Sequence, residues 1–121
     1  MLRFTEEHEW VRIDGAVATV GITNYAQDTL GDITFVDLPK VGKVVKKGES
    51  LCVVESVKAA SDVYAPVGGT VTAVNAALGS APELINQSAE KDGWLCTLGS
   101  FDAAELGSLM TADQYEAWCK K

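Results

Sequence analysis

The spacing of the glycines most limits the folds open to this chain. Eleven glycines are spread along 121 residues, and there are only three prolines. The stretches between the glycines are short and rich in valine, isoleucine and threonine, residue types that favour β-strands. The pattern therefore predicts a mostly β domain built from many short strands, with few helices, all at its periphery.

Turn residues mark where these strands begin and end. Asp14-Gly15 separates two extended runs within Trp10–Ile22, and this dipeptide suits the positive φ angles of a tight hairpin turn. The other strands are expected at 33–38, 43–45, 51–55, 62–64, 70–75 and 94–99, with breaks at Pro39, Gly42, Lys47-Gly48, Pro66 and Gly68-Gly69. A first hairpin followed by a β-rich domain is the resulting prediction.

Three segments have the features of short helices. Residues 23–31 begin with a threonine and an asparagine that can cap a helix, and they end with glycine, which predicts about two turns. Pro82–Asn86 reads as one helical turn with proline at its start. The tail, at about 102–119, has apolar residues at helical spacing and a second capping residue at Thr111, so it predicts C-terminal helices.

Two weak internal similarities suggest a repeat. Residues 15–20 resemble 69–74, and residues 51–54 resemble 95–98. We therefore expect two half-domains that pack face to face.

Composition excludes several classes of protein. A net charge of −7 argues against a nucleic-acid surface and favours partners with basic faces. No apolar run approaches the roughly 18 residues of a membrane span, and the acidic amino terminus is unlike a secretory signal, so an intracellular protein is expected. Cys52, Cys96 and Cys119 lack metal-ligand spacing and are expected to be free thiols. One histidine and no phosphate-binding loop argue against an independent enzyme.

The most informative segment is Glu55–Asp62. One expected strand ends near Glu55 and the next begins near Asp62, so Lys58 occupies a hairpin turn. The neighbours of this lysine are small or apolar and none is glycine: Ser56, Val57, Ala59 and Ala60. A lysine in a loop is usually only a solvated charge, but a turn this stiff suits presentation to an enzyme.

The sequence ESVKAASDVYAP at 55–66 resembles the lipoylation hairpin of glycine cleavage H-proteins. The resemblance covers nearly the whole chain, with ordered matches at 8–11, 21–23, 25–27, 30–32, 38–39, 82–86, 93–95 and 109–110. The segment 88–92 departs from the family pattern, which usually has proline and tyrosine at the positions of Ala89 and Glu90.

The resemblance implies a barrel-sandwich hybrid, in which two small sheets with quasi-two-fold symmetry form a flattened barrel with short peripheral and C-terminal helices. Residues 1–121 would form a single, monomeric lipoyl-carrier domain whose lysine-bearing hairpin spans about 51–65. The internal similarities noted above agree with that symmetry.

The resemblance also implies roles for particular residues. Lys58 would carry lipoate through an amide bond, attached by a lipoate ligase or lipoyl transferase. The residues that this enzyme would recognise are Glu55, Ser56, Val57, Ala59 and Asp62. Glu9 and Asp62, with His8 nearby, would hold the ammonium of the loaded arm in a cleft; otherwise Glu9 is a strand surface residue and His8 a spectator. No metal site is expected.

In function, the resemblance implies a carrier without catalytic activity of its own. It would take the aminomethyl group of glycine from a pyridoxal-phosphate glycine decarboxylase and pass it to a tetrahydrofolate-dependent aminomethyltransferase. Dihydrolipoamide dehydrogenase would then reoxidise the arm. The expected location is the cytoplasm, or the mitochondrial matrix for a processed eukaryotic chain.

Other interpretations remain open from the sequence. An H-like protein can instead relay lipoyl groups to other complexes. A biotin carrier is disfavoured because Val57 and Ala59 stand where methionines typically flank the biotinylated lysine. An unmodified β-barrel interaction module, with Lys58 as a mere loop tip, belongs to a different class. Trp10, Trp94 and Trp118 are interpreted as core or seam residues.

Overall fold

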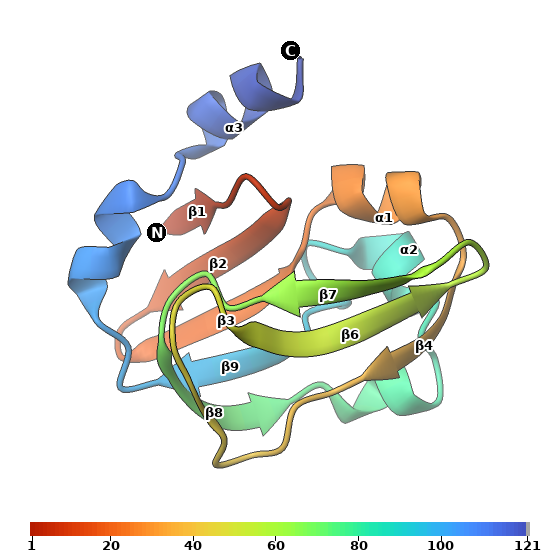
Figure 1. Ribbon diagram of the computed structural model, residues 1–121, viewed down its shortest axis with the longest axis horizontal. Coiled ribbons are helices and arrows are strands. Elements are labelled where there is room, and N and C mark those ends of the chain that lie inside the picture. Colours follow the sequence, from red (N-terminus) through yellow and green to blue (C-terminus); the bar gives the residue numbers. More distant parts are fainter. Residues whose placement is uncertain (121) are drawn as a thin grey trace.

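The computed structural model describes residues 1–120 and consists mainly of antiparallel strands in two sheets (Figure 1). One sheet has six strands in the order β1-β2-β3-β9-β8-β5, and the other has three in the order β4-β6-β7. The strands are β1 (Leu2–Phe4), β2 (Glu9–Asp14), β3 (Val17–Ile22), β4 (Ile33–Asp37), β5 (Val44–Val45), β6 (Ser50–Ser56), β7 (Ala60–Tyr64), β8 (Gly69–Val74) and β9 (Cys96–Gly99). The mostly β, two-sheet architecture is confirmed.

Within the described residues, five short helices lie around the sheets. They are α1 (Asn24–Leu30), the 3-10 helix η1 (Ala76–Gly79), α2 (Leu84–Ser88), the 3-10 helix η2 (Ala103–Ser108) and α3 (Ala112–Cys119). Thr23 caps α1 by accepting a hydrogen bond from Ala26 N, and Gly31 ends the helix at a φ of 82°. Thr111 begins α3 with a capping box. The expected ends of both helices are confirmed.

The structure differs from the sequence-based expectation in several places, and the 3-10 helix η1 is one element that the sequence does not predict. Strand β1 was not expected, because three residues are too few to show an alternating pattern. Helix α2 begins at Leu84, two residues after Pro82, since the turn before it is held by bonds of the 3-10 type. The similarity of 15–20 to 69–74 does not relate two half-domains, because β3 and β8 flank β9 in one sheet. The similarity of 51–54 to 95–98 does relate the two sheets. It matches β6, the middle strand of the smaller sheet, with β9, one of the two middle strands of the larger sheet.

Buried residues from both sheets form the core. Val20, Leu51 and Leu98 belong to one apolar cluster, and Val54, Ile85 and Leu95 belong to a second. Burying each such side chain stabilises the fold by roughly 1.5–3 kcal/mol. The core therefore fixes β6, at the centre of the smaller sheet, and with it the hairpin that β6 forms with β7.

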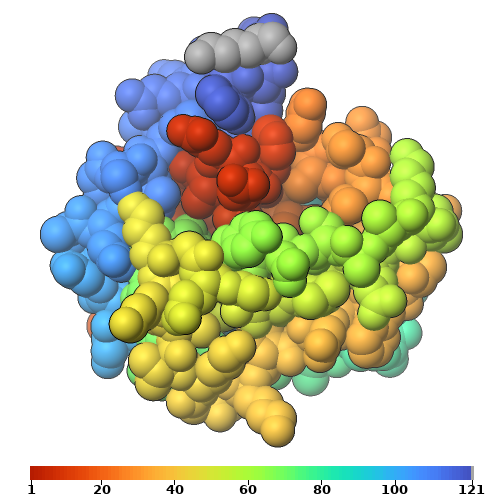
Figure 2. All heavy atoms as spheres, in the orientation of Figure 1, coloured from red at the N-terminus to blue at the C-terminus, as the bar shows by residue number. Residues whose placement is uncertain are grey.

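A third cluster attaches the C-terminal helix to the first strands. Phe4, Trp10 and Tyr115 are buried together, and the rings of Phe4 and Tyr115 stack with centroids 4.6 Å apart. The space-filling view shows the N-terminal segment lying between the C-terminal segment and the region of α1 (Figure 2). Gly21 faces Trp10 so closely that an added Cβ would lie 2.5 Å from the indole ring. Only glycine fits at that position without movement of the ring.

None of the helices within residues 1–120 combines the length and the apolar character needed to span a membrane.

Candidate functional site

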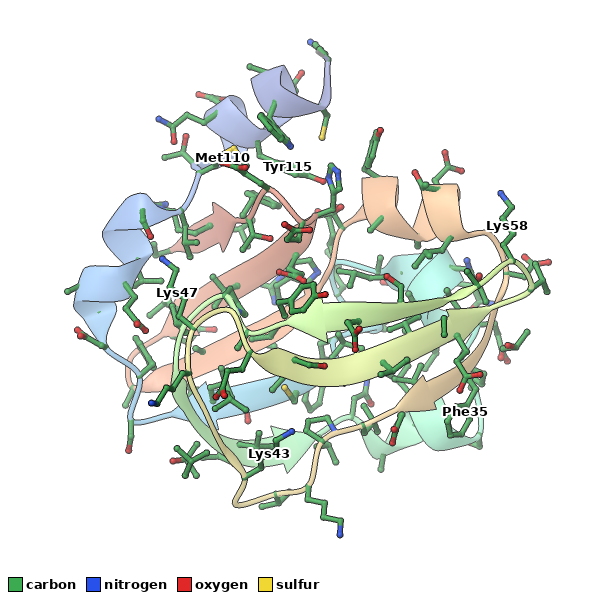
Figure 3. All side chains as sticks on the ribbon, in the orientation of Figure 1. Phe35, Lys43, Lys47, Lys58, Met110 and Tyr115 are labelled. Carbon is green, nitrogen blue, oxygen red and sulfur yellow. The ribbon has the colours of Figure 1, made fainter. Side chains whose placement is uncertain are left out.

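The hairpin of β6 and β7 presents Lys58 at its tip. The last paired residues of the two strands are Glu55 and Ala60, so residues 56–59 lie between this pair and form the turn. Lys58 is exposed and lies beside the end of α1, at the opposite side of the molecule from Lys47 (Figure 3). The predicted position of Lys58 in a hairpin turn is confirmed.

Ser56 organises this turn. Its backbone N–H donates to the carbonyl of Ala59 at 2.9 Å, and its hydroxyl donates to the same carbonyl at 3.1 Å. The hydroxyl oxygen also accepts from the backbone N–H groups of Lys58 and Ala59, each at 3.2 Å. A serine side chain thus makes a stiff turn without glycine.

A second attachment holds the tip against the segment that follows α1. The backbone N–H of Val57 donates to the carbonyl of Asp32 at 3.0 Å. The Lys58 side chain extends over the end of α1, where its Nζ donates to the carbonyl of Thr29 at 3.4 Å. The amine stays at the surface, because its residue is exposed and this bond is long. A covalent group of the kind that the sequence predicts would fit here.

The other residues expected to take part in recognition lie on the same hairpin. Glu55, Val57 and Ala59 are exposed, and 66% of Val57 is accessible to solvent. Asp62 lies further along β7, where its carboxylate accepts from the Ser50 hydroxyl at 3.0 Å. The hairpin that presents Lys58 therefore also carries two carboxylates and an exposed apolar side chain.

Phe35 of β4 is an exposed aromatic residue beside the lysine hairpin that the sequence did not single out. It pairs with Glu55 and is 51% exposed. The register of β4 and β6 shifts between Ile33 and Phe35. A bulge of this kind turns the following residue to the other face of the sheet. The alternation of the sequence gave no sign of it.

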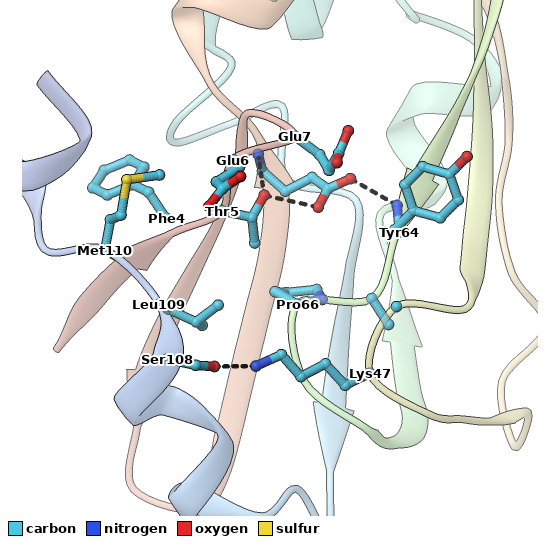
Figure 4. A pocket seen from close by; sticks show the side chains of 13 residues that line it. Phe4, Thr5, Glu6, Glu7, Lys47, Tyr64, Pro66, Ser108, Leu109 and Met110 are labelled. Atoms are coloured by element: carbon cyan, nitrogen blue, oxygen red, sulfur yellow. Dashed lines mark hydrogen bonds between the residues drawn. The ribbon is translucent and has the colours of Figure 1, made fainter. Parts of the chain in front are cut away.

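A surface cleft of about 390 Å³ lies at the other end of β7 (Figure 4). Four parts of the chain enclose it: the region of the β1–β2 turn, Lys47 and Gly48, the segment from Tyr64 to Pro66, and the C-terminal segment from Ser108 to Met110. Lys47 bridges one end of the cleft through its contact with the Ser108 hydroxyl. The contributions of Tyr64, Lys47 and Met110 were not expected, because residues this far apart in sequence meet only in the fold.

Glu9 contributes a buried carboxylate to this cleft. The residue is 2% exposed; its Oε1 accepts from the Thr5 hydroxyl at 2.9 Å and its Oε2 from the backbone N–H of Tyr64 at 2.7 Å. Burial raises the pKa of Glu9 to about 7; the two hydrogen bonds oppose this rise and the nearby Glu7 adds to it. Within residues 1–120 this carboxylate makes no salt bridge, so it is suited to receive a cation.

His8 and Asp62 do not line the cleft with Glu9. His8 has a φ of 67°, stacks on Tyr25, and lies with its Nδ1 2.7 Å from the hydroxyl of Tyr115. Burial lowers the pKa of His8, and the charge of Glu7 opposes this shift. The structure therefore joins Glu9 to the end of β7, directs His8 towards α3, and leaves Asp62 on β7 between the cleft and the tip.

The tryptophans, the cysteines and the segment 88–92 are the remaining features that the sequence singled out. Trp10 is fully buried and donates through Nε1 to the carbonyl of Ala89 at 3.0 Å, and Trp94 and Trp118 pack against the same cluster, as expected. The three cysteines are free. Glu90 accepts from the backbone N–H of Asn24 at 2.9 Å, so the segment that departs from the family pattern is still well packed. Among the described residues no group of three or more histidine, cysteine or acidic side chains is placed to hold a metal ion.

A small two-sheet scaffold that holds one exposed lysine on a stiff hairpin defines a carrier-type domain. The family model for the glycine cleavage H-protein matches residues 2–121, and the chain belongs to that family. The family is one of lipoate carriers; an H-protein is the carrier component of the glycine cleavage system and not its catalyst.

Individual relatives agree with the family match. The glycine cleavage system H protein of Caulobacter vibrioides is 56% identical over 117 residues, which cover 97% of each chain. A putative mitochondrial H protein of Schizosaccharomyces pombe is 48% identical over 118 residues, covering 98% of this chain and 70% of the relative. The crystal structure of a glycine cleavage system H protein from Mycobacterium marinum has a TM-score of 0.88 at 37% identity, covering 99% of this chain and 97% of that one.

Proposed function

We propose that Lys58 carries lipoate through an amide bond at its Nζ, and that the whole chain acts as one lipoyl-carrier domain. The observation that carries this proposal is the exposed lysine on a turn fixed by Ser56 and by the carbonyl of Asp32. A rigid hairpin supplies position, and the flexible arm supplies reach. Glu55, Val57 and Asp62 are the surface features by which a lipoate ligase or lipoyl transferase recognises the hairpin.

Membership of the H-protein family supports a proposal about partners, namely the other components of the glycine cleavage system. When bound, the lipoyl group supplies a disulfide that accepts the aminomethyl group released from glycine. The chain itself carries the arm from the pyridoxal-phosphate glycine decarboxylase to the tetrahydrofolate-dependent aminomethyltransferase, and then to dihydrolipoamide dehydrogenase. The scaffold meets all three partners with the same tip, because Lys58 lies at the surface of the molecule.

Glu9 and its cleft form the second part of the proposal. Its buried carboxylate receives the ammonium of the loaded arm, and apolar side chains such as Pro66 and Leu109 line the surrounding walls. Asp62 lies on β7 between Lys58 and the cleft, so it contacts the arm along its path. His8 acts only indirectly, through its contact with Tyr115, whose ring stacks on the cleft-lining Phe4.

The attachment site is tested by producing the protein together with a lipoate ligase and lipoate, followed by mass spectrometry of its peptides. The adduct is expected on the peptide that contains Lys58 and on no other. Lys58→Arg should abolish it, whereas Lys43→Arg, a matched change at another surface lysine, should leave it intact. An unmodified Lys58 under these conditions would favour the interaction module instead.

The cleft is tested with loaded protein by comparing Glu9→Ala with Glu6→Ala, a change at a second acidic residue that lines the same cleft. Loss of the Glu9 carboxylate should speed the decay of the loaded arm, because the neutral amine can expel the thiolate while the ammonium cannot. Equal decay in the Glu9→Ala variant and the unchanged protein would remove the proposed role of Glu9.

A further inference from the structure

Asn86 of α2 holds the segment against which the hairpin tip rests. Its side-chain Oδ1 accepts from the backbone N–H of Ile33 at 2.8 Å, and its Nδ2 donates to the carbonyl of Gly31 at 2.9 Å. Nδ2 also donates to the side-chain oxygen of Gln27 at 3.0 Å. One amide side chain therefore binds the residues on both sides of Asp32.

The three hydrogen bonds of the Asn86 side chain form a clamp, and Asp32 connects this clamp to the tip of the hairpin. Its carbonyl accepts the backbone N–H of Val57, the residue before Lys58. With Gly31 and Ile33 both bound to Asn86, the peptide groups next to Asp32 have little freedom to turn. The position of the Asp32 carbonyl, and hence of Val57 N–H, is therefore set by the Asn86 side chain, which belongs to α2 and to neither of the two segments that it positions.

Asn86 can act as a fixed point because its own element is anchored. The preceding residue, Ile85, is completely buried in the cluster that also contains Val54 of β6. Gly31 lies directly beneath the lysine, since a Cβ added there would be 3.5 Å from Lys58 Cε and 3.8 Å from Val57 Cγ2. The clamp and the lysine side chain thus meet at the same residue.

We infer that Asn86 is a positioning residue for Lys58. It acts through Asp32 and Val57 and does not touch the amine. The inference rests on the proposed function in one respect, namely that an enzyme modifies Lys58. An enzyme that binds the hairpin then meets a tip already held in place, so less conformational freedom is lost on binding. Weakening the clamp should raise the KM for modification and leave kcat nearly unchanged.

Two substitutions separate the donated bonds from the accepted one. Asn86→Asp keeps an acceptor for Ile33 N–H but places an oxygen against the carbonyl of Gly31, whereas Asn86→Ala removes all three bonds. Gln87→Ala is the matched control, because Gln87 is the exposed neighbour on the same helix. The readouts are amide hydrogen exchange at Val57 and Val54 by NMR, and the KM and kcat of a purified lipoate ligase acting on each variant.

We expect both Asn86 variants to exchange the Val57 amide about five- to tenfold faster and to raise KM by a similar factor, as the loss of a hydrogen bond would. Exchange at Val54, kcat and the Gln87→Ala control should change little. Unchanged exchange at Val57, or equal acceleration at Val54, would overturn the inference, as would faster exchange with an unchanged KM. If unaltered protein is not lipoylated at Lys58, the proposed function fails, while exchange at Val57 still tests the clamp.

Discussion

Replacing Glu9 with glutamine should remove most of the dependence of stability on pH near neutrality. The carboxyl group titrates near its usual value of 4.5 in the unfolded chain and at about 7 in the folded protein. Because the folded-state pKa is raised, the folded protein binds the proton more tightly. The stability that this proton contributes is fully present below about pH 4.5 and is lost as the pH rises through about 7.

The magnitude follows from the two pKa values. Their difference, at about 1.4 kcal/mol for each pH unit, corresponds to about 3 kcal/mol of unfolding free energy. That is a large part of the roughly 5–15 kcal/mol typical of a domain. Glutamine imitates the protonated acid, because its oxygen can accept from Tyr64 N–H while its amide donates to the hydroxyl of Thr5.

The assay is urea unfolding of both proteins at about pH 5 and about pH 8.5, on either side of the raised pKa. The unaltered protein should lose about 2–3 kcal/mol more than Glu9→Gln between these conditions, and the variant should be the more stable protein at the higher pH. Glu6→Gln is the control for a change of net charge at the same cleft. Parallel pH dependence in the unaltered protein and in Glu9→Gln would refute the reasoning.

Two further predictions concern packing. Gly21→Ala should cost about 3 kcal/mol of unfolding free energy, since its Cβ would overlap the buried ring of Trp10; Gly107→Ala, with open space around it, should cost almost nothing in the same urea assay. Tyr115→Phe should cost about 1–2 kcal/mol, because it leaves His8 Nδ1 and the fully buried hydroxyl of Thr23 without their shared partner. A loss below about 0.5 kcal/mol would show that this hydroxyl is not needed.

Local chemistry made much of this fold predictable from sequence. Thr23, Gly31 and Thr111 end or begin helices through bonds to residues at most four positions away, and such signals are legible in one short segment. The hairpin that carries Lys58 was also predictable, because its two strands adjoin in sequence. These features need no knowledge of the rest of the chain.

Features that depend on distant contacts were not predictable in this way. The bulge that exposes Phe35 depends on how β4 registers against β6. The cleft brings Met110 to the β1–β2 turn, and the Asn86 clamp joins two helices to the lysine hairpin. An asparagine in PELIN looks like an ordinary helical polar residue until the fold places Gly31 and Ile33 beside it.

The location of the termini has a consequence for engineering. The first strand packs against α3 in the upper part of the view, and the lysine hairpin projects at the right-hand side (Figure 1). A protein fused before Met1 or after α3 would therefore stand away from the tip. Tethering the chain to a surface or to a partner enzyme through either terminus should leave the lysine facing outward, which suits its use as a portable module in designed assemblies.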